Sequence, residues 1–127
     1  MKEIDLAIIG NIAFSREVTQ GGEKLCIDGG AYCSAVGASS ISKKIGLVSR
    51  VGPEFDLTTL TKREIDIEGI KVIPEGKTPI FTVYQHGDGT RTFTASEMGV
   101  ASEVDVDIFP KSYLSAKYIY LATSLPE

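Results

Sequence analysis

Histidine, cysteine and tryptophan are scarce in this sequence, and their scarcity excludes several kinds of site. The 127 residues contain no tryptophan, one histidine (His86) and two cysteines (Cys26 and Cys33). A single histidine excludes a His-based catalytic triad and a multi-histidine metal centre. The two cysteines flank a Gly-Gly pair at a spacing that fits neither a zinc clamp nor a redox dithiol, so we interpret them as buried, reduced thiols. His86 adjoins Gly87 and is expected in a solvent-exposed turn.

Clusters of basic residues and long hydrophobic runs are also missing. Lys and Arg total 13 against 17 Asp and Glu, for a net charge of −4. Without a basic stripe to meet a phosphate backbone, we expect no nucleic-acid partner. The segment Met1–Asp5 is acidic where a signal peptide would be basic, and the apolar stretch after it ends at Gly10, too short to span a bilayer. We therefore expect a cytoplasmic protein with no membrane partner.

The apolar pattern predicts a single α/β domain. With 43% hydrophobic residues, the chain has enough apolar material for one buried core. The nearly unbroken apolar run Ile4–Ile9 is typical of a parallel strand covered on both faces, and Leu47–Val51 has the same character. A further strand is expected over Lys117–Ala122. These strands would form the main sheet.

Two segments are expected to leave this main layer. Residues 14–27 mix polar and apolar positions around Gly21-Gly22, which is typical of a partly exposed hairpin. Ile80–Gln85 and Thr90–Ala95 are rich in β-branched and aromatic residues and flank a glycine-rich turn, a clear hairpin signal. We predict that segments of about 14–27 and 78–95 form a projecting β lid.

Helical periodicity begins after Gly29-Gly30. Small or apolar residues recur there at intervals of three or four positions: Ala31, Ala35, Ala38, Ile41 and Ile45. Lys43 and Lys44 are expected in the last turn, with Gly46 as a left-handed C-cap. A second, short helix is expected from Gly52-Pro53-Glu54 to about Lys62.

The Gly29-Gly30 pair is the best candidate for one wall of a small-molecule site. It follows a strand-like segment and opens a helix, so free backbone N–H groups and the positive end of the helix dipole would face a polar ligand. Small residues behind the pair allow close approach of a ligand. Two other glycine motifs fail. Gly76-Lys77-Thr78 lacks the upstream glycine of a P-loop, and Gly10 lacks the later glycines of a dinucleotide fingerprint.

The last four residues, Ser124–Glu127, have the spacing of a helix capping box with no helix after it. We therefore expect the chain to be a fragment of a longer protein.

In their order along the chain, these features resemble the N-terminal portion of the ribokinase-like (PfkB) carbohydrate kinases. The resemblance covers essentially all 127 residues. It implies an α/β, ribokinase-like fold: a partial Rossmann-like parallel sheet with helices and a projecting β lid, without the C-terminal nucleotide-binding half. The segments that carry it are Gly10-Asn11, Gly29-Gly30 with Ala31 and Ser34, Ile45–Phe55, Thr78-Pro79, Gly87–Arg91, Tyr118–Leu121 and Leu125–Glu127.

This resemblance also implies an activity and a site. The complete protein would transfer the γ-phosphoryl group of ATP, with Mg²⁺, to a hydroxyl of a sugar, polyol or nucleoside, and its lid would cover the acceptor and form a homodimer. The residues implied at the acceptor pocket are Gly29, Gly30 and Ser34, with Tyr32 beside them and Asn11, Ala13 and Ser15 in the loop after the first strand.

The sequence departs from the family pattern at two of these positions. Ser15 stands where ribokinases usually carry an aspartate, and Ser34 where they usually carry an asparagine. Both changes reduce the number of groups that hold vicinal hydroxyls, so ribose is disfavoured. With Tyr32, they resemble relatives that act on inositol or other non-ribose acceptors.

The catalytic part of the family pattern is absent. The Gly-Ala-Gly-Asp segment that supplies the family's general base does not occur, so we assign no catalytic and no metal-binding residue. The chain alone is expected to be inactive and to bind neither ATP nor Mg²⁺. We interpret Asp28, Asp56, Asp88 and Asp105 as turn or cap residues. The alternatives are a non-catalytic module that binds a small polyol or dimerises, and an α/β domain that shares only the topology.

Overall fold

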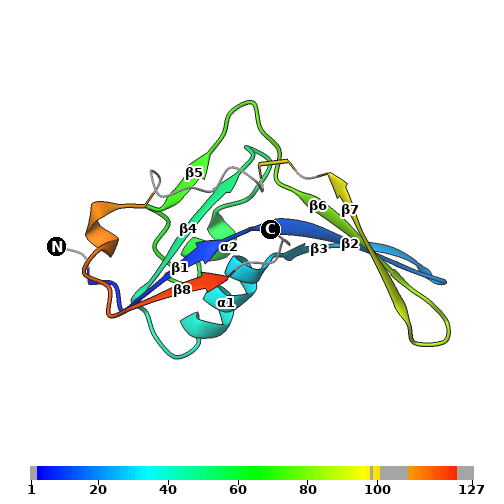
Figure 1. The fold of residues 1–127 in the computed structure, drawn as a ribbon, viewed down its shortest axis with the longest axis horizontal. Helices are drawn as coiled ribbons and strands as arrows, with labels where there is room; N and C mark the ends of the chain where they lie inside the picture. The colour runs from blue at the N-terminus through cyan, green and yellow to red at the C-terminus, as the bar shows by residue number, and fades with distance from the viewer. Residues whose placement is uncertain (1–2, 98, 101–108, 123–127) are drawn as a thin grey trace.

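The computed structural model describes residues 3–97, 99–100 and 109–122, which form two sheets and two helices (Figure 1). A central sheet has the strand order β5-β4-β1-β8, and a second sheet has the order β3-β2-β6-β7. In chain order the elements are β1 (Leu6–Gly10), β2 (Ala13–Thr19), β3 (Gly22–Asp28), α1 (Gly30–Ser39), β4 (Ile45–Val51), α2 (Thr58–Thr61), β5 (Ile70–Val72), β6 (Ile80–Gln85), β7 (Arg91–Glu97), a 3₁₀ turn (Lys111–Tyr113) and β8 (Tyr118–Ala122).

The central sheet is parallel, and its middle strand β1 pairs with β4 on one side and β8 on the other. Both faces of β1 are buried, as its unbroken apolar sequence predicts. Ile8 belongs to the core that includes Ala31 and Ala35 of α1, whereas Ala7 packs with Tyr113 on the opposite face. The predicted α/β class with a parallel sheet is confirmed.

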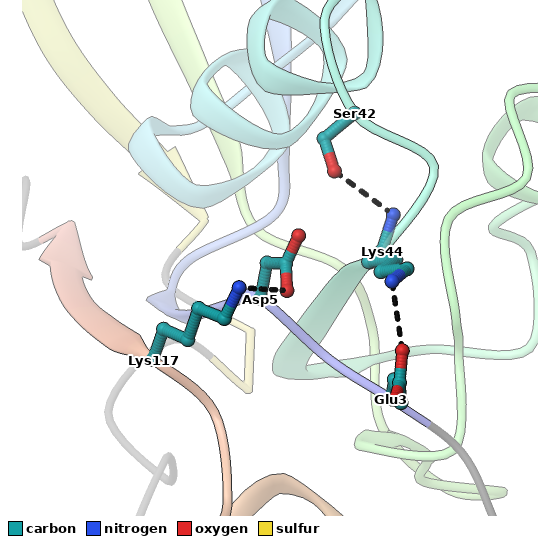
Figure 2. Close-up of polar contacts among 5 residues, drawn as sticks. All are labelled: Glu3, Asp5, Ser42, Lys44 and Lys117. Carbon is teal, nitrogen blue, oxygen red and sulfur yellow. Dashed lines mark hydrogen bonds and ion pairs between the residues drawn. The ribbon is translucent and has the colours of Figure 1, made fainter.

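Charged residues close the amino-terminal end of this sheet (Figure 2). Asp5, Lys44 and Lys117 directly precede β1, β4 and β8. The Lys117 ammonium lies 3.7 Å from the Asp5 carboxylate, and the Lys44 ammonium lies 2.7 Å from Glu3. Lys44 lowers the pKa of Glu3, first through this hydrogen bond and then through its charge. Exposed pairs of this kind add little stability. They occupy the amino-terminal end of the parallel strands, and other residues occupy the carboxyl-terminal end.

The two predicted excursions form the second sheet, which extends away from the central one (Figure 1). The hairpins β2–β3 and β6–β7 are each antiparallel, and β2 and β6 join them in parallel. Phe14 N–H donates to the Pro79 carbonyl where the two hairpins start. The two predicted segments therefore belong to one sheet.

Helix α1 is shorter than predicted. It ends at Ser39, where the Ser39 and Ser40 hydroxyls donate to the Val36 and Gly37 carbonyls. These bonds satisfy carbonyls that a further helical turn would use. The predictions that Lys43 and Lys44 lie in the last turn and that Ile41 lies on its apolar face are wrong, since Ile41 is 90% exposed.

Gly46 is not a helix cap but a residue of β4. A Cβ on Gly46 would lie 2.7 Å from the Tyr113 ring. The glycine is therefore required by the packing of Tyr113 against the sheet. The second helix also starts later than predicted, at Thr58, whose N–H and hydroxyl both donate to the Asp56 carboxylate.

The two cysteines are free, as predicted, but they are not buried: Cys26 is half-buried and Cys33 is exposed. Cys33 lies in the first turn of α1. His86 is exposed, as predicted, and its Nε2 lies 2.7 Å from the Thr92 hydroxyl. The predicted capping box at Ser124–Glu127 lies outside the described residues.

Tyr113 is expected to make stability depend on alkaline pH. Its buried hydroxyl donates to the Asp66 carboxylate and accepts the Gly69 N–H, and burial followed by that carboxylate raises the tyrosine pKa far above 10. Above about pH 10 the unfolded state loses this proton and the folded state keeps it, so stability falls by about 1.4 kcal/mol per pH unit. Tyr113→Phe should cost about 1–2 kcal/mol at neutral pH and flatten this decline in urea unfolding from pH 8 to 11. Parallel pH profiles would contradict this prediction.

Candidate functional site

The candidate site lies at the carboxyl-terminal end of the central sheet. The ends of β1 and β8 meet the start of α1 there, at Gly10, Ala122 and Gly30. A Cβ on Gly10 would lie 2.1 Å from the Ala122 carbonyl oxygen, and one on Gly30 would lie 3.3 Å from it. Only glycine permits this approach at Gly10. Ligands of open α/β sheets bind at this end of the strands, so the predicted Gly-Gly pair lies where such a ligand is expected.

Gly29 is fixed by both its conformation and its surroundings. Its φ is 101°, and a Cβ would lie 2.4 Å from the Asn11 carbonyl oxygen. That same carbonyl accepts the Ala31 N–H at 3.2 Å. The glycine is thus required for the loop after β1 to contact the start of α1.

The expectation of free amides at this turn is wrong for Gly29. Its N–H donates to the Asp28 Oδ1 at 2.8 Å, because the Asp28 side chain folds back over the turn. The N–H of Ala31 is bound to Asn11. A ligand would therefore meet the helix dipole and the half-exposed backbone of the glycine pair rather than a full set of unpaired donors.

The predicted pocket residues differ in their exposure to solvent. Asn11, Ala13 and Ser15 are buried, while Ser34 is half-buried on α1. Ala13 pairs with Asp28 across the β2–β3 hairpin, and Ser15 pairs with Cys26. Side chains alternate along a strand, so Ser15, Cys26 and Asp28 share one face of the hairpin.

Tyr32 lies on the other side of that hairpin. Its ring packs edge-on against Phe55, with ring centroids 6.4 Å apart, and Phe55 packs against Phe14 at 6.1 Å. Since Phe14 and Ser15 are neighbours on β2, they face opposite ways. The structure thus brings Asn11 and Ala13 against Gly29, and places Ser15 on β2 and Ser34 on α1. The Tyr32 ring packs against Phe55 instead.

A buried threonine ties the second sheet to the central one. Thr78, just before β6, accepts the Gly52 N–H through its hydroxyl at 2.9 Å, and its own N–H donates to Glu54 at 2.5 Å. Gly52 directly follows β4. Sequence reasoning used Gly52, Glu54 and Thr78 only as parts of a family pattern and missed that they contact each other. These bonds hold the start of β6 against the end of β4.

Sequence reasoning also missed the role of Asp28 in this turn. Its Oδ1 accepts the Gly29 N–H and also lies 3.4 Å from the Cys33 sulfur. Partial burial and then this hydrogen bond raise the pKa of the Cys33 thiol, so Cys33 is not an activated nucleophile. The position of Asp28, directly before the glycine pair, was the only signal in the sequence.

Among the described residues, no group of three or more His, Cys, Asp or Glu side chains is arranged to hold a metal ion. In the same part of the chain, no helix is long and apolar enough to cross a membrane.

Comparisons with known proteins bear on the fold. A scan against protein-family models finds no match. A cytidine kinase from Thermococcus kodakarensis is 31% identical over 98% of this chain and 45% of its own length. A ribokinase structure from Giardia lamblia superposes with a TM-score of 0.82 at 14% identity, covering 97% of this chain and 43% of the ribokinase.

A third relative is a sugar kinase from Pyrococcus horikoshii, solved in complex with ATP. It superposes with a TM-score of 0.71 at 21% identity, covering 91% of this chain and 42% of the kinase. The chain thus spans less than half the length of each of these relatives. The comparisons confirm the fold and the family resemblance predicted from the sequence.

Proposed function

Because this chain has the fold of the N-terminal portion of the ribokinase-like (PfkB) carbohydrate kinases, we propose that it forms the acceptor side of such a kinase. The complete protein would transfer the γ-phosphoryl group of ATP to a hydroxyl of a sugar, polyol or nucleoside. The observation that carries the proposal is the Gly29-Gly30 turn at the carboxyl-terminal end of a parallel sheet, next to a projecting β sheet. In this arrangement, one small polar ligand would bind on the glycine turn and be covered by the second sheet.

A nucleoside is the first acceptor to test, since the relative with 31% identity is named a cytidine kinase. Sugars and inositol are the next acceptors to test. Gly30 and Ser34 are half-exposed and offer small polar contacts that do not favour one kind of sugar or inositol ring over another. Ser15 and Ser34 stand where ribokinases usually carry an aspartate and an asparagine. Other groups near the glycine pair would therefore determine which acceptor binds.

ATP and Mg²⁺ belong to the complete protein in this proposal. The described residues do not fit either group, since they contain no carboxylate cluster for a cation and no glycine-rich loop that cradles phosphate. No step of phosphoryl transfer is assigned to them. The nucleotide site and the catalytic base would come from the part of the fold that the relatives have in addition.

Isothermal titration with cytidine, ribose, fructose and myo-inositol tests the acceptor side. We expect saturable binding of at least one of these compounds and no binding of Mg-ATP. Absence of binding for the whole panel would contradict the proposal. Binding that is never followed by phosphoryl transfer in any longer form of the protein would favour the alternative, a non-catalytic polyol-binding module.

A homodimer through the second sheet remains part of the proposal. The outer strands of this sheet carry exposed apolar side chains, among them Leu25 at 58% and Phe93 at 63% exposure. Exposed apolar groups on outer strands favour association.

A further inference from the structure

We propose that the Asp28 carboxylate binds the acceptor directly, as the residue that holds one of its hydroxyl groups. This inference rests on the proposed function, since it assigns a role within the same acceptor site. It also revises the interpretation of Asp28 as a turn residue alone.

The contacts of Asp28 leave half of its carboxylate available. Both hydrogen bonds that it accepts, from the Gly29 N–H and the Cys33 thiol, reach Oδ1. Oδ2 has no partner among the residues that the structure describes. Asp28 is half-buried, so a carboxylate oxygen that no described residue occupies lies beside the glycine pair, where a ligand can reach it.

The orientation of Asp28 follows from strand register. Asp28 ends β3 and pairs with Ala13, so it shares a hairpin face with Ser15 and lies away from the Phe14, Phe55 and Tyr32 packing. The bond to Gly29 then holds the side chain against the start of α1. The carboxylate is thus fixed in position before any ligand arrives, which lowers the entropic cost of binding.

The chemistry of the group defines the ligand. An ionised carboxylate accepts hydrogen bonds and donates none, so Oδ2 selects O–H groups and repels phosphate. The acceptor class that fits is an uncharged polyhydroxy compound, such as the ribose of a nucleoside or a sugar. An acceptor that already carries phosphate close to this hydroxyl would be disfavoured.

Asp28→Asn separates binding from structure. Asparagine keeps an oxygen for the Gly29 N–H but replaces Oδ2 by an NH₂ donor. We expect the Kd for the best compound of the panel to rise about tenfold or more, with a melting temperature close to that of the unchanged protein. The matched control is Asp56→Asn, which makes the same change in a carboxylate that accepts the Thr58 N–H outside the site and should leave Kd unchanged.

The outcomes are distinguishable. If the unchanged protein binds no compound of the panel, the proposed function fails and this inference fails with it. If the unchanged protein binds and Asp28→Asn binds equally well, only this inference is overturned. If Asp28→Asn lowers both the melting temperature and the affinity, Asp28→Ser decides, because serine caps the turn without a charge. Restored stability with weak binding supports the inference, and restored binding overturns it.

Discussion

Replacing Gly29 with alanine is expected to lower the free energy of unfolding by about 3 kcal/mol or more. Part of the cost is conformational, because a φ of 101° is unfavourable for a residue with a Cβ, by about 1–2 kcal/mol. The rest is steric, because the new Cβ would lie 2.4 Å from the backbone oxygen of Asn11, which cannot move without displacing the loop after β1. Urea unfolding measures the effect.

Gly37→Ala is the matched control for this prediction. Gly37 is exposed in the middle of α1, and a Cβ there would meet nothing within 4 Å. Alanine should therefore stabilise the protein by about 0.5–1 kcal/mol through helix propensity. If the two substitutions changed stability equally, the close contact between the turn and Asn11 would be wrong, and with it the geometry of the candidate site.

The exposed strand β8 is expected to make the isolated chain self-associate. Its Tyr118, Ile119, Tyr120 and Leu121 are 50–70% exposed, although β8 belongs to a parallel sheet, whose strands are usually covered on both faces. An apolar edge strand that is exposed in this way recruits other chains.

Ile119→Lys with Leu121→Lys places two charges on one face of this strand and should shift the protein to monomers in sedimentation velocity. Leu114→Lys is the control, because Leu114 is 71% exposed but lies outside the strand. A monomeric unchanged chain at about 100 µM, within the µM to mM range in which exposed apolar edges associate, would contradict the prediction. An equal effect of Leu114→Lys would contradict it as well.

The strands and the two hairpins could be predicted from the sequence because they depend on local patterns. β1 is apolar at every position, and the glycine-rich turn after Gln85 separates two β-branched segments. The Gly29-Gly30 turn could be predicted for the same reason. Its glycines are needed for conformation and close approach, which the residue types themselves indicate.

The details that could not be predicted depend on contacts between distant segments. The end of α1 is set by serine hydroxyls that compete with helical bonds, and Gly46 serves the Tyr113 ring, which is far along the chain. The position of the Tyr32 ring depends on Phe55. The direction of Asp28 depends on its register opposite Ala13, which a periodicity argument cannot supply.

The central claim is that the Gly29-Gly30 end of the sheet binds the acceptor, and an NMR titration of isotope-labelled protein with cytidine tests it most directly. The account predicts that the backbone amide signals of Gly29, Gly30 and Ser34 shift together and saturate. Shifts confined to Glu17, Thr19 and Gly21–Lys24, which line a hollow on the first hairpin, would contradict it. So would a spectrum that cytidine, ribose and myo-inositol all leave unchanged.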